Sequence, residues 1–328
     1  MRAMVLEQLN RPLQSKELPQ PMPLGCELLI KIQACALCRT DLHVWNGELP
    51  NIHLPLILGH QAIGEVVAKG PKSHAFDIGD LVGAAWLAKS CQHCGFCEAG
   101  QENLCDHGTY RGYQINGGFA EYTTADENYI YRIPAGYSAI EAAPFLCGGL
   151  IGYRAWHMLE ACQTLGYYGF GSSAHLLIQL AHYTHQKVFA FTRPGDHTGQ
   201  TFAKSLGAVW AGDSDQQPPE PLDGAILFAP VGSLVPAALK AVRKGGVVVC
   251  AGIHMSEIPA FSYDLLYGER VLRSVTNLTR ADGHAFFELA AKHRFHSHVT
   301  TYPLEQATQA LQDLKEGKFQ GSAVLVIN

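Results

Sequence analysis

The chain has 328 residues, a formal net charge of −5 and a pI near 6.3. Its hydrophobic fraction of 47% and charged fraction of 16% are typical of a packed globular protein and exclude a disordered or fibrous chain. The acidic balance and the lack of a Lys/Arg cluster argue against nucleic acid or an anionic membrane surface as a partner.

The N-terminus and the cysteines indicate a cytoplasmic protein. The first twenty residues contain charges and scattered prolines instead of the apolar core of a signal peptide. No apolar run reaches the roughly 18 residues that a membrane-spanning helix needs. We therefore expect the ten cysteines to stay reduced, which leaves them able to bind metal.

The first part of the chain, up to about residue 130, is predicted to form short strands separated by turns. The expected strands include Glu27–Ala34, Ile63–Ala68 and Tyr129–Ile133. Gly79-Asp80 and Gly117-Gly118 are typical of the turns between such strands.

From about residue 150, strands alternate with helices. The predicted strands are Gly166–Gly169, Lys187–Phe191, Ala208–Ala211, Gly224–Ala229 and Val247–Ala251. The predicted helices are Ala174–Ala181, Thr198–Leu206, Leu234–Val242 and, further along, Ala285–Lys292. Apolar strands that are each followed by a helix indicate a doubly wound parallel sheet. The tail Thr300–Ile327 has strand-rich ends that could return to the first domain.

Four cysteines form a C-x2-C-x2-C-x7-C string at Cys91, Cys94, Cys97 and Cys105. At this spacing a short loop can wrap one tetrahedral zinc ion. Disulfides are the alternative, but the short spacing crowds the sulfurs and nothing else indicates an oxidising compartment. Because four thiolates leave no open coordination position, the string predicts a structural zinc site.

The segment GFGSSA at residues 169–174 fits the dinucleotide-binding pattern G-x-G-x-x-A between a strand and a helix. Gly169 permits the tight turn, and Gly171 lets a pyrophosphate approach the backbone. Ala174 lets the helix pack closely on the strand. The start of the helix, with Ser172 and Ser173, offers N–H groups and a positive dipole end to the phosphates. An ordinary glycine-rich turn is the alternative.

The end of the following strand bears on the choice of cofactor. An acidic residue there would bind the ribose 2′-hydroxyl of NAD, whereas an arginine would accommodate the 2′-phosphate of NADP. The strand ends in Thr192 and Arg193, and no acid follows before Asp196. A hydroxyl and a guanidinium suit a phosphate, so NADP(H) is favoured over NAD(H). The alternative is that Arg193 is a solvated charge and Asp196 folds back to the ribose.

Cys38, His60 and Cys147 are further candidates for metal binding. Two cysteines and a histidine with one open position are what a catalytic zinc uses to polarise an alcohol or carbonyl oxygen. Their spacing alone does not bring them together, and a lone Cys or His is more often packed in a core.

The order of motifs resembles that of zinc-containing alcohol dehydrogenases of the medium-chain dehydrogenase/reductase superfamily over nearly the whole chain. The motifs are Cys38-Arg39-Thr40-Asp41-Leu42-His43, Gly59-His60, Gly64-Glu65-Val66, Gly79-Asp80, the four-cysteine string, Ala143-Pro144 before Cys147, and the turn at Gly169. The resemblance implies an α/β protein with a mostly β, GroES-like catalytic domain at residues 1–150 and 286–328. This domain carries the zinc lobe 91–105, and a Rossmann cofactor domain covers residues 151–285.

The resemblance also implies roles for single residues. Cys38, His60 and Cys147 would ligate a catalytic zinc, which makes two zinc ions per chain. Thr40 would accept the proton of the alcohol, and His43 would pass it to solvent.

Three further residues take roles from the resemblance. Asp41 would hydrogen-bond the other ring nitrogen of His60, although a turn-capping carboxylate is the alternative. Arg39 would touch the cofactor pyrophosphate, or else be a surface charge. Trp86 would line a pocket for small alcohols, or else belong to the core.

Two residues depart from the family pattern. Gln61 stands where the family usually has a glutamate behind the zinc, which adds about one unit of positive charge to the site. Ser322 stands where the family often has an arginine that contacts a cofactor phosphate.

We therefore expect an alcohol dehydrogenase that interconverts primary or secondary alcohols with aldehydes or ketones by hydride transfer with a nicotinamide cofactor. The expected assembly is a homodimer or homotetramer. One alternative is an NADPH-dependent aldehyde reductase of the cinnamyl-alcohol type. Another is a non-catalytic redox sensor that binds zinc and dinucleotide.

Overall fold

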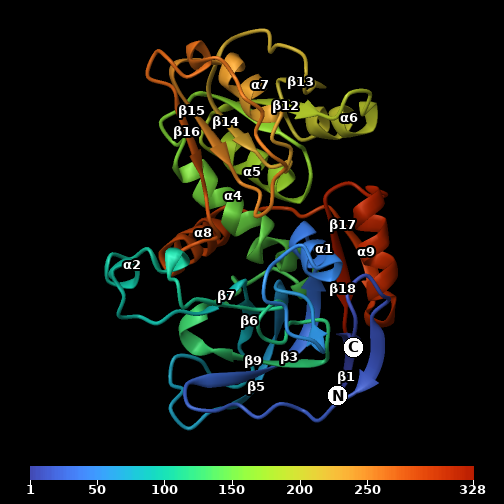
Figure 1. Cartoon of the computed structure of the whole chain (residues 1–328). Helices are drawn as coiled ribbons and strands as arrows, with labels where there is room; N and C mark the ends of the chain where they lie inside the picture. The colour runs from blue at the N-terminus through green and yellow to red at the C-terminus, as the bar shows by residue number, and fades with distance from the viewer. The chain divides into compact units, whose positions relative to one another are not determined.

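The computed structural model describes residues 1–328 as two compact units. The first unit comprises Met1–Leu150 and Asn277–Asn328, and the second comprises Ile151–Thr276. Strands and helices occur in both units, so the predicted α/β class is confirmed (Figure 1). None of the helices combines the length and the apolar character needed to cross a bilayer.

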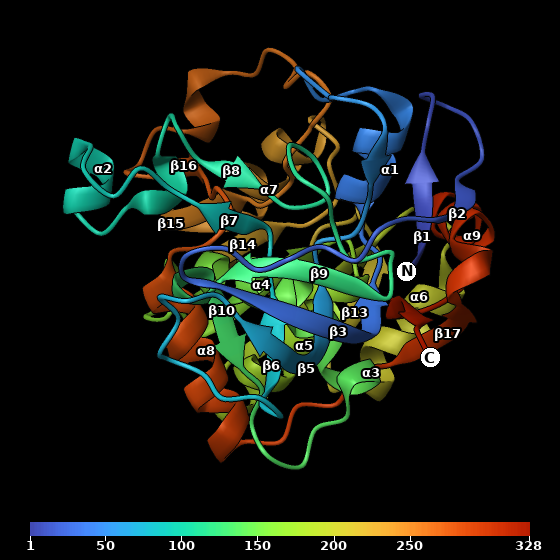
Figure 2. The ribbon, with the colours of Figure 1, turned by 90° about the horizontal axis from the view of Figure 1, so that it is seen from below.

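A mainly antiparallel sheet forms the centre of the first unit. Its strand order is β10-β6-β5-β3-β18-β17, and β9 also pairs with β3. The bounds are β3 Glu27–Ala36, β5 Ala62–Lys69, β6 Leu81–Ala84, β9 Tyr122–Asp126, β10 Ile130–Arg132, β17 Val299–Pro303 and β18 Ser322–Val326. Figure 2 shows β3 between β9 and β5.

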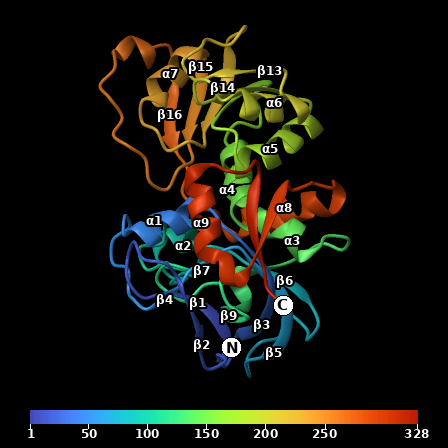
Figure 3. The same ribbon diagram turned by 90° about the vertical axis from the view of Figure 1, so that its right-hand side faces the viewer.

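The C-terminal segment completes this sheet. β18 pairs antiparallel with β3, with Leu325 opposite Cys35, and the backbone N–H of Leu37 donates to the carbonyl of Ala323 at 2.9 Å. The strand-rich ends of the tail are thus confirmed as β17 and β18. Between them lies α9 (Ala307–Glu316), a helix that the sequence analysis did not predict, beside α1 (Arg39–Asn46) in Figure 3.

The return of the chain to the first unit begins at Asn277, earlier than the predicted residue 286. Helix α8 spans Arg280–Lys292 and starts with a capping box between Thr279 and Asp282. Its Phe286 packs edge-to-face on Phe145 at 5.7 Å between ring centroids. This aromatic contact packs α8 against a buried residue of the first unit.

The remaining elements of the first unit are short. Two small sheets contain β1 Arg2–Leu6, β2 Gln14–Glu17, β4 Leu56–Ile57, β7 Leu87–Lys89 and β8 Thr109–Tyr110. The short helices are α2 Gly95–Glu98 and α3 Ala139–Ala142. One apolar core joins β1, α1, α9 and β18 through buried residues such as Leu6, Trp45 and Leu311.

The second unit is a six-stranded, fully parallel sheet with the order β13-β12-β11-β14-β15-β16. Its strands are β11 Thr164–Tyr168, β12 Lys187–Thr192, β13 Trp210–Asp213, β14 Leu222–Leu227, β15 Val242–Cys250 and β16 Val271–Ser274. Its helices are α5 Ser172–Tyr183, α6 His197–Ser205 and α7 Leu234–Ala241, together with α4 Gly148–His157 from Ile151 onward. The strand order outward in both directions from β11 is that of a doubly wound sheet, as predicted.

Candidate active site and metal centres

The start of α1 fixes the first group of predicted site residues. Cys38 is the N-cap, and its sulfur accepts a hydrogen bond from the backbone N–H of Thr40 at 3.2 Å. Asp41 closes the capping box, because its carboxylate accepts from the backbone N–H of Cys38 at 2.8 Å. The helix cap therefore holds the Cys38 sulfur in one position at the helix N-terminus.

Asp41 also contacts His60. Its Oδ1 lies 3.2 Å from Nδ1 of His60 and accepts from the backbone N–H of Gly59 at 3.2 Å. Both side chains are fully buried. The contact engages Nδ1 and leaves Nε2 of His60 facing the Cys38 sulfur at 3.3 Å. Asp41 is thus both a helix cap and the partner of His60, so the two sequence interpretations of this residue apply together.

The third residue, Cys147, comes from the segment before α4. Its sulfur lies 3.7 Å from that of Cys38, and the three ligand atoms of Cys38, His60 and Cys147 all lie within 4.8 Å of one another. Around a tetrahedral zinc, two sulfurs are separated by about 3.8 Å and a sulfur and a nitrogen by about 3.5 Å. A disulfide would need about 2.05 Å. The donor set and its spacing therefore fit a metal ion with one open position.

Of the three residues, only Cys38 is shifted toward the protonation state that binds a metal. The hydrogen bond between the two thiols lowers the pKa of Cys38 and raises that of Cys147. Burial lowers the pKa of His60, but the charges of Asp41 and Cys38 outweigh it and raise this pKa to about 10. The negative charge on Cys38 suits a cation between the ligands, and a metal that binds there would displace the protons of His60 and Cys147.

Trp86 lies against the same histidine. Its ring meets that of His60 edge-on, with 5.0 Å between centroids. It also stacks on Tyr110 at 5.2 Å and on Tyr113 at 5.7 Å. Trp86 is 7% exposed, so it belongs to the core as well as to the surroundings of the site.

The other residues of the predicted proton path also lie on α1. Thr40 is buried, and His43 follows it by three positions, which places the two on neighbouring parts of the helix surface. Nδ1 of His43 contacts the carboxylate of Glu48. Sequence reasoning missed Glu48; the only signal was an acidic residue directly after the glycine that ends the helix. Arg39 is the exposed first residue of α1.

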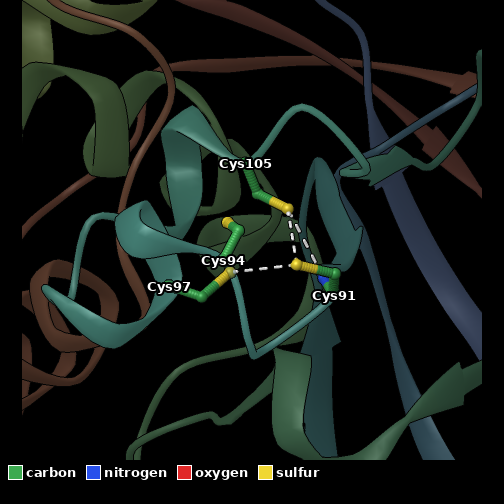
Figure 4. Close-up of side chains that lie close together, drawn as sticks. All are labelled: Cys91, Cys94, Cys97 and Cys105. Atoms are coloured by element: carbon green, nitrogen blue, oxygen red, sulfur yellow. Dashed lines mark hydrogen bonds between the residues drawn. The ribbon is translucent and has the colours of Figure 1, made fainter.

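The four cysteines of the string converge in a loop around α2 (Figure 4). The sulfur of Cys91 lies 3.9 Å from that of Cys97 and 3.5 Å from that of Cys105, again near the edge of a zinc tetrahedron. All four are free thiols. The Ser90 hydroxyl, 3.4 Å from the Cys97 sulfur, lowers the pKa of that thiol.

A partly buried ion pair connects this loop to α8. Glu102, which is 3% exposed, accepts from the backbone N–H of Arg280 at 2.8 Å and from its Nε at 3.0 Å. Burial raises the pKa of Glu102, but these bonds outweigh it and lower the pKa below its usual value. The four-cysteine loop is therefore attached to the segment where the chain re-enters the first unit.

The predicted dinucleotide turn lies between β11 and α5 in the second unit. Gly169 has φ +91°, and a Cβ there would lie 2.9 Å from the backbone N of Ala229, so only glycine fits. Around Gly171 a Cβ would meet nothing within 4 Å, which leaves room for a phosphate. The helix starts at Ser172, with Ser173 in its first turn, and Ala174 is fully buried.

At the end of β12, Thr192 is buried and Arg193 is exposed. Asp196 is the N-cap of α6 and accepts from the backbone N–H of Gly199 at 2.8 Å, which argues against its folding back to a ribose. Sequence reasoning missed Asp213, which pairs with Thr192 in the sheet and accepts from the backbone N–H of Gly195 at 3.1 Å.

Known proteins share these features. Residues 25–135 match the model of the alcohol dehydrogenase GroES-like domain. A probable alcohol dehydrogenase, AdhA, of Mycobacterium tuberculosis (strain CDC 1551 / Oshkosh) is 46% identical over 326 residues, which cover 96% of this chain and 93% of that protein. The chain belongs to the zinc-type alcohol dehydrogenases of the medium-chain dehydrogenase/reductase superfamily.

Two further comparisons agree. An alcohol dehydrogenase of Geobacillus stearothermophilus is 34% identical over 100% of both chains. The structure of a cinnamyl alcohol dehydrogenase from Sorghum bicolor shares the fold, with a TM-score of 0.91 and 22% identity over 99% of this chain and 97% of that one. The protein is thus an alcohol dehydrogenase that acts on small-molecule alcohols, and the alternative of a non-catalytic sensor is not supported.

The two residues that depart from the family pattern, Gln61 and Ser322, are both buried. Gln61 is 1% exposed, and neither polar atom of its side chain makes a hydrogen bond. An unsatisfied buried amide costs about 1–3 kcal/mol. Ser322 is also 1% exposed, at the start of β18, where its backbone N–H donates to the carbonyl of His298 at 2.9 Å. The substitution at residue 61 therefore places a neutral, unsatisfied amide directly after a predicted metal ligand.

Proposed function

We propose that this alcohol dehydrogenase holds a catalytic zinc on Cys38, His60 and Cys147 and a structural zinc on the four-cysteine string. The supporting observation is the set of ligand-atom separations, 3.3 Å between sulfur and nitrogen and 3.7 Å between sulfurs, in a cluster of two half-buried thiols and a buried imidazole. When bound there, zinc would supply Lewis-acid polarisation of an alcohol or carbonyl oxygen.

The chain's own residues would orient the substrate and move one proton. Oxidation of an alcohol yields a carbonyl compound, a hydride for the nicotinamide cofactor and a proton. Thr40, next to the Cys38 sulfur, would take the proton from the alcohol oxygen, and His43 would pass it to solvent. Trp86 would restrict the alcohol to a small one, since its ring lies against His60.

NADP(H) is proposed as the preferred cofactor. Arg193 is exposed at the end of β12, and Asp196 is engaged as a helix cap instead of facing the ribose. The turn at Gly169 and the first turn of α5, with Ser172 and Ser173, would bind the pyrophosphate, together with Arg39.

A homo-oligomer, dimeric or tetrameric, is also proposed. β16 is an edge strand that pairs only with β15. Val271 on this strand and the nearby Tyr263 and Tyr267 are 44%, 70% and 67% exposed. An exposed apolar edge is a site for pairing with a second copy. Light scattering on the purified protein measures the assembly, and the cytoplasmic location stays a prediction.

An NADPH-dependent aldehyde reductase of the cinnamyl-alcohol type is the second candidate, favoured by the exposed Arg193. A panel of small aliphatic and large aromatic alcohols and aldehydes, each with NADPH and NADH, decides between the two. Higher kcat/KM for small alcohols supports the main proposal, and higher kcat/KM for cinnamaldehyde-like substrates supports the second. No turnover of any substrate by zinc-loaded protein would contradict both.

A further inference from the structure

Both carboxylate oxygens of Glu48 are engaged at the C-terminal end of α1. Oε2 contacts Nδ1 of His43, and Oε1 accepts from Nδ2 of Asn46 at 2.8 Å. The side chain of His43 is 13% exposed and that of Glu48 is 37% exposed. Glu48 therefore connects a largely buried imidazole to water, and its carboxylate is held in one orientation.

The backbone builds this pair. Residues five apart do not face each other on a regular helix, so Glu48 would point away from His43 if α1 continued. Instead Gly47 adopts the left-handed conformation, with φ 76°, and ends the helix. The backbone N–H of Glu48 then donates to the carbonyl of His43 at 2.9 Å. A side chain at Gly47 is excluded by conformation and by Leu9, whose Cδ1 lies 2.7 Å from the place of a Cβ.

We propose that Glu48 is a positioning residue of the proton path, which orients the imidazole of His43 and receives the proton that leaves it. This inference rests on the proposed function. A carboxylate at Nδ1 selects the tautomer with hydrogen on Nδ1, so that Nε2 carries no hydrogen and is the accepting nitrogen of the ring. His43 follows Thr40 by three positions, which places its ring on the same side of α1 as the Thr40 hydroxyl.

The proton balance is simple. During alcohol oxidation Nε2 gains the proton that leaves through Thr40, the N–H bond at Nδ1 breaks, and the carboxylate of Glu48 takes that proton. Glu48 then releases it to water, so one proton reaches solvent for each hydride transferred. Carbonyl reduction runs the same path in reverse.

The first test is kinetic and uses the full-length, zinc-loaded protein. Glu48→Ala should lower kcat for alcohol oxidation about 10-fold to 100-fold, below the full range of general acid–base effects because Glu48 acts through His43. KM for alcohol and cofactor should stay within about twofold, and the solvent deuterium isotope effect on kcat should rise. Glu48→Asp and added formate should each restore part of the rate. Glu65→Ala, on an exposed residue of β5, is the matched control and should behave like wild type.

The second test separates a shared path from two independent effects. If Glu48 acts through His43, the double variant Glu48→Ala/His43→Ala should have nearly the same kcat as His43→Ala alone. The inference would be overturned if the two losses of kcat were additive in free energy, if Glu48→Ala left kcat unchanged, or if Glu48→Ala changed only KM. None of these outcomes would contradict the dehydrogenase activity itself.

A readout without turnover keeps the inference testable even if the proposed function fails. Nitrogen NMR of ¹⁵N-histidine-labelled protein should show hydrogen on Nδ1 of His43 in the wild type. In Glu48→Ala the Nε2–H tautomer should gain population. Absence of catalysis with this tautomer shift present would reject only the proposed function, and an unchanged tautomer would reject the role of Glu48.

Discussion

The sulfur atoms of Cys38 and Cys147 lie 3.7 Å apart, although 109 residues separate them in the sequence. Cys38 is fixed by the start of α1 and Cys147 by the segment before α4. Two independent elements thus place thiols at the distance that a tetrahedral metal imposes. This coincidence is the strongest structural support for a metal centre in the first unit.

Cys147→Ala should remove one zinc ion per chain and abolish turnover, because only two of the three proposed protein ligands remain. Dinucleotide affinity, measured by cofactor fluorescence, should stay unchanged, since the Gly169 turn lies in the second unit. Cys162→Ala, on a half-buried thiol of that unit, is the control and should retain zinc and activity. Retained turnover in Cys147→Ala would refute the ligand assignment.

Asp41→Asn should weaken zinc binding at the proposed catalytic site about 10-fold to 100-fold, the usual effect of altering a partner of a metal-bound histidine. The cause is the loss of the charge that faces Nδ1 of His60 at 3.2 Å. Competition with a chelator measures the affinity, and the four-cysteine site in the same protein is an internal reference. Asp77→Asn, on a 93% exposed side chain, is the control and should leave the zinc affinity of both sites unchanged. If Asp41→Asn binds zinc as tightly as the wild type, the contact between Asp41 and His60 does not influence metal binding.

Arg193→Ala should raise the Kd for NADPH about tenfold or more, because a guanidinium–phosphate hydrogen bond contributes about 1.5–3 kcal/mol. The Kd for NADH should change less than about twofold, since NADH has no 2′-phosphate. Lys204→Ala, on the exposed side of α6, controls for general loss of positive charge. An equal rise in the Kd values for NADPH and NADH would contradict a contact between Arg193 and the 2′-phosphate.

The ionised carboxylate of Asp223 should stabilise the fold, and this contribution should be lost in acid. Burial raises its pKa, but Arg243 at 2.6 Å and the backbone N–H groups of Gln163 and Thr164 outweigh burial and lower it to about 2. Because the folded-state pKa lies below the ordinary value of about 3.9, the stabilisation is complete above that pH and is lost as the pH falls toward 2.

Thermal unfolding of Asp223→Asn should therefore start about 2–4 °C below wild type at pH 7. The difference in unfolding temperature between the wild type and Asp223→Asn should narrow when the pH falls from about 4 toward 2. Asp215→Asn, on an exposed residue of the same unit, should match wild type throughout. A gap that is constant with pH would show that the charge of Asp223 does not stabilise the fold.

Much of the second unit could be predicted because its apolar runs coincide with its strands. β12 ends one residue beyond the predicted Phe191, whereas β15 begins at Val242 instead of Val247. The sequence Arg243–Gly246 has the polar and glycine-rich character of a turn. In the structure, the pairing of β15 with β14 has a register shift beside Leu222, and this shift keeps the stretch within the strand. Such pairing between strands is a long-range effect and cannot be predicted from the local composition.

The site could be predicted only in part from the residues themselves. The four-cysteine string is local, so its spacing alone indicates zinc. Cys38, His60 and Cys147 are brought together by the fold, and only the resemblance to a family linked them. Glu48 was missed because its contact with His43 depends on the left-handed turn at Gly47.

Elemental analysis of zinc per chain, in protein purified without added metal or chelator, would count the metal centres of this protein. We expect two zinc ions per wild-type chain, and one in Cys147→Ala with the four-cysteine site still filled. One zinc in the wild-type protein, unchanged by Cys147→Ala and with no second ion taken up on adding zinc, would contradict a metal centre at Cys38, His60 and Cys147.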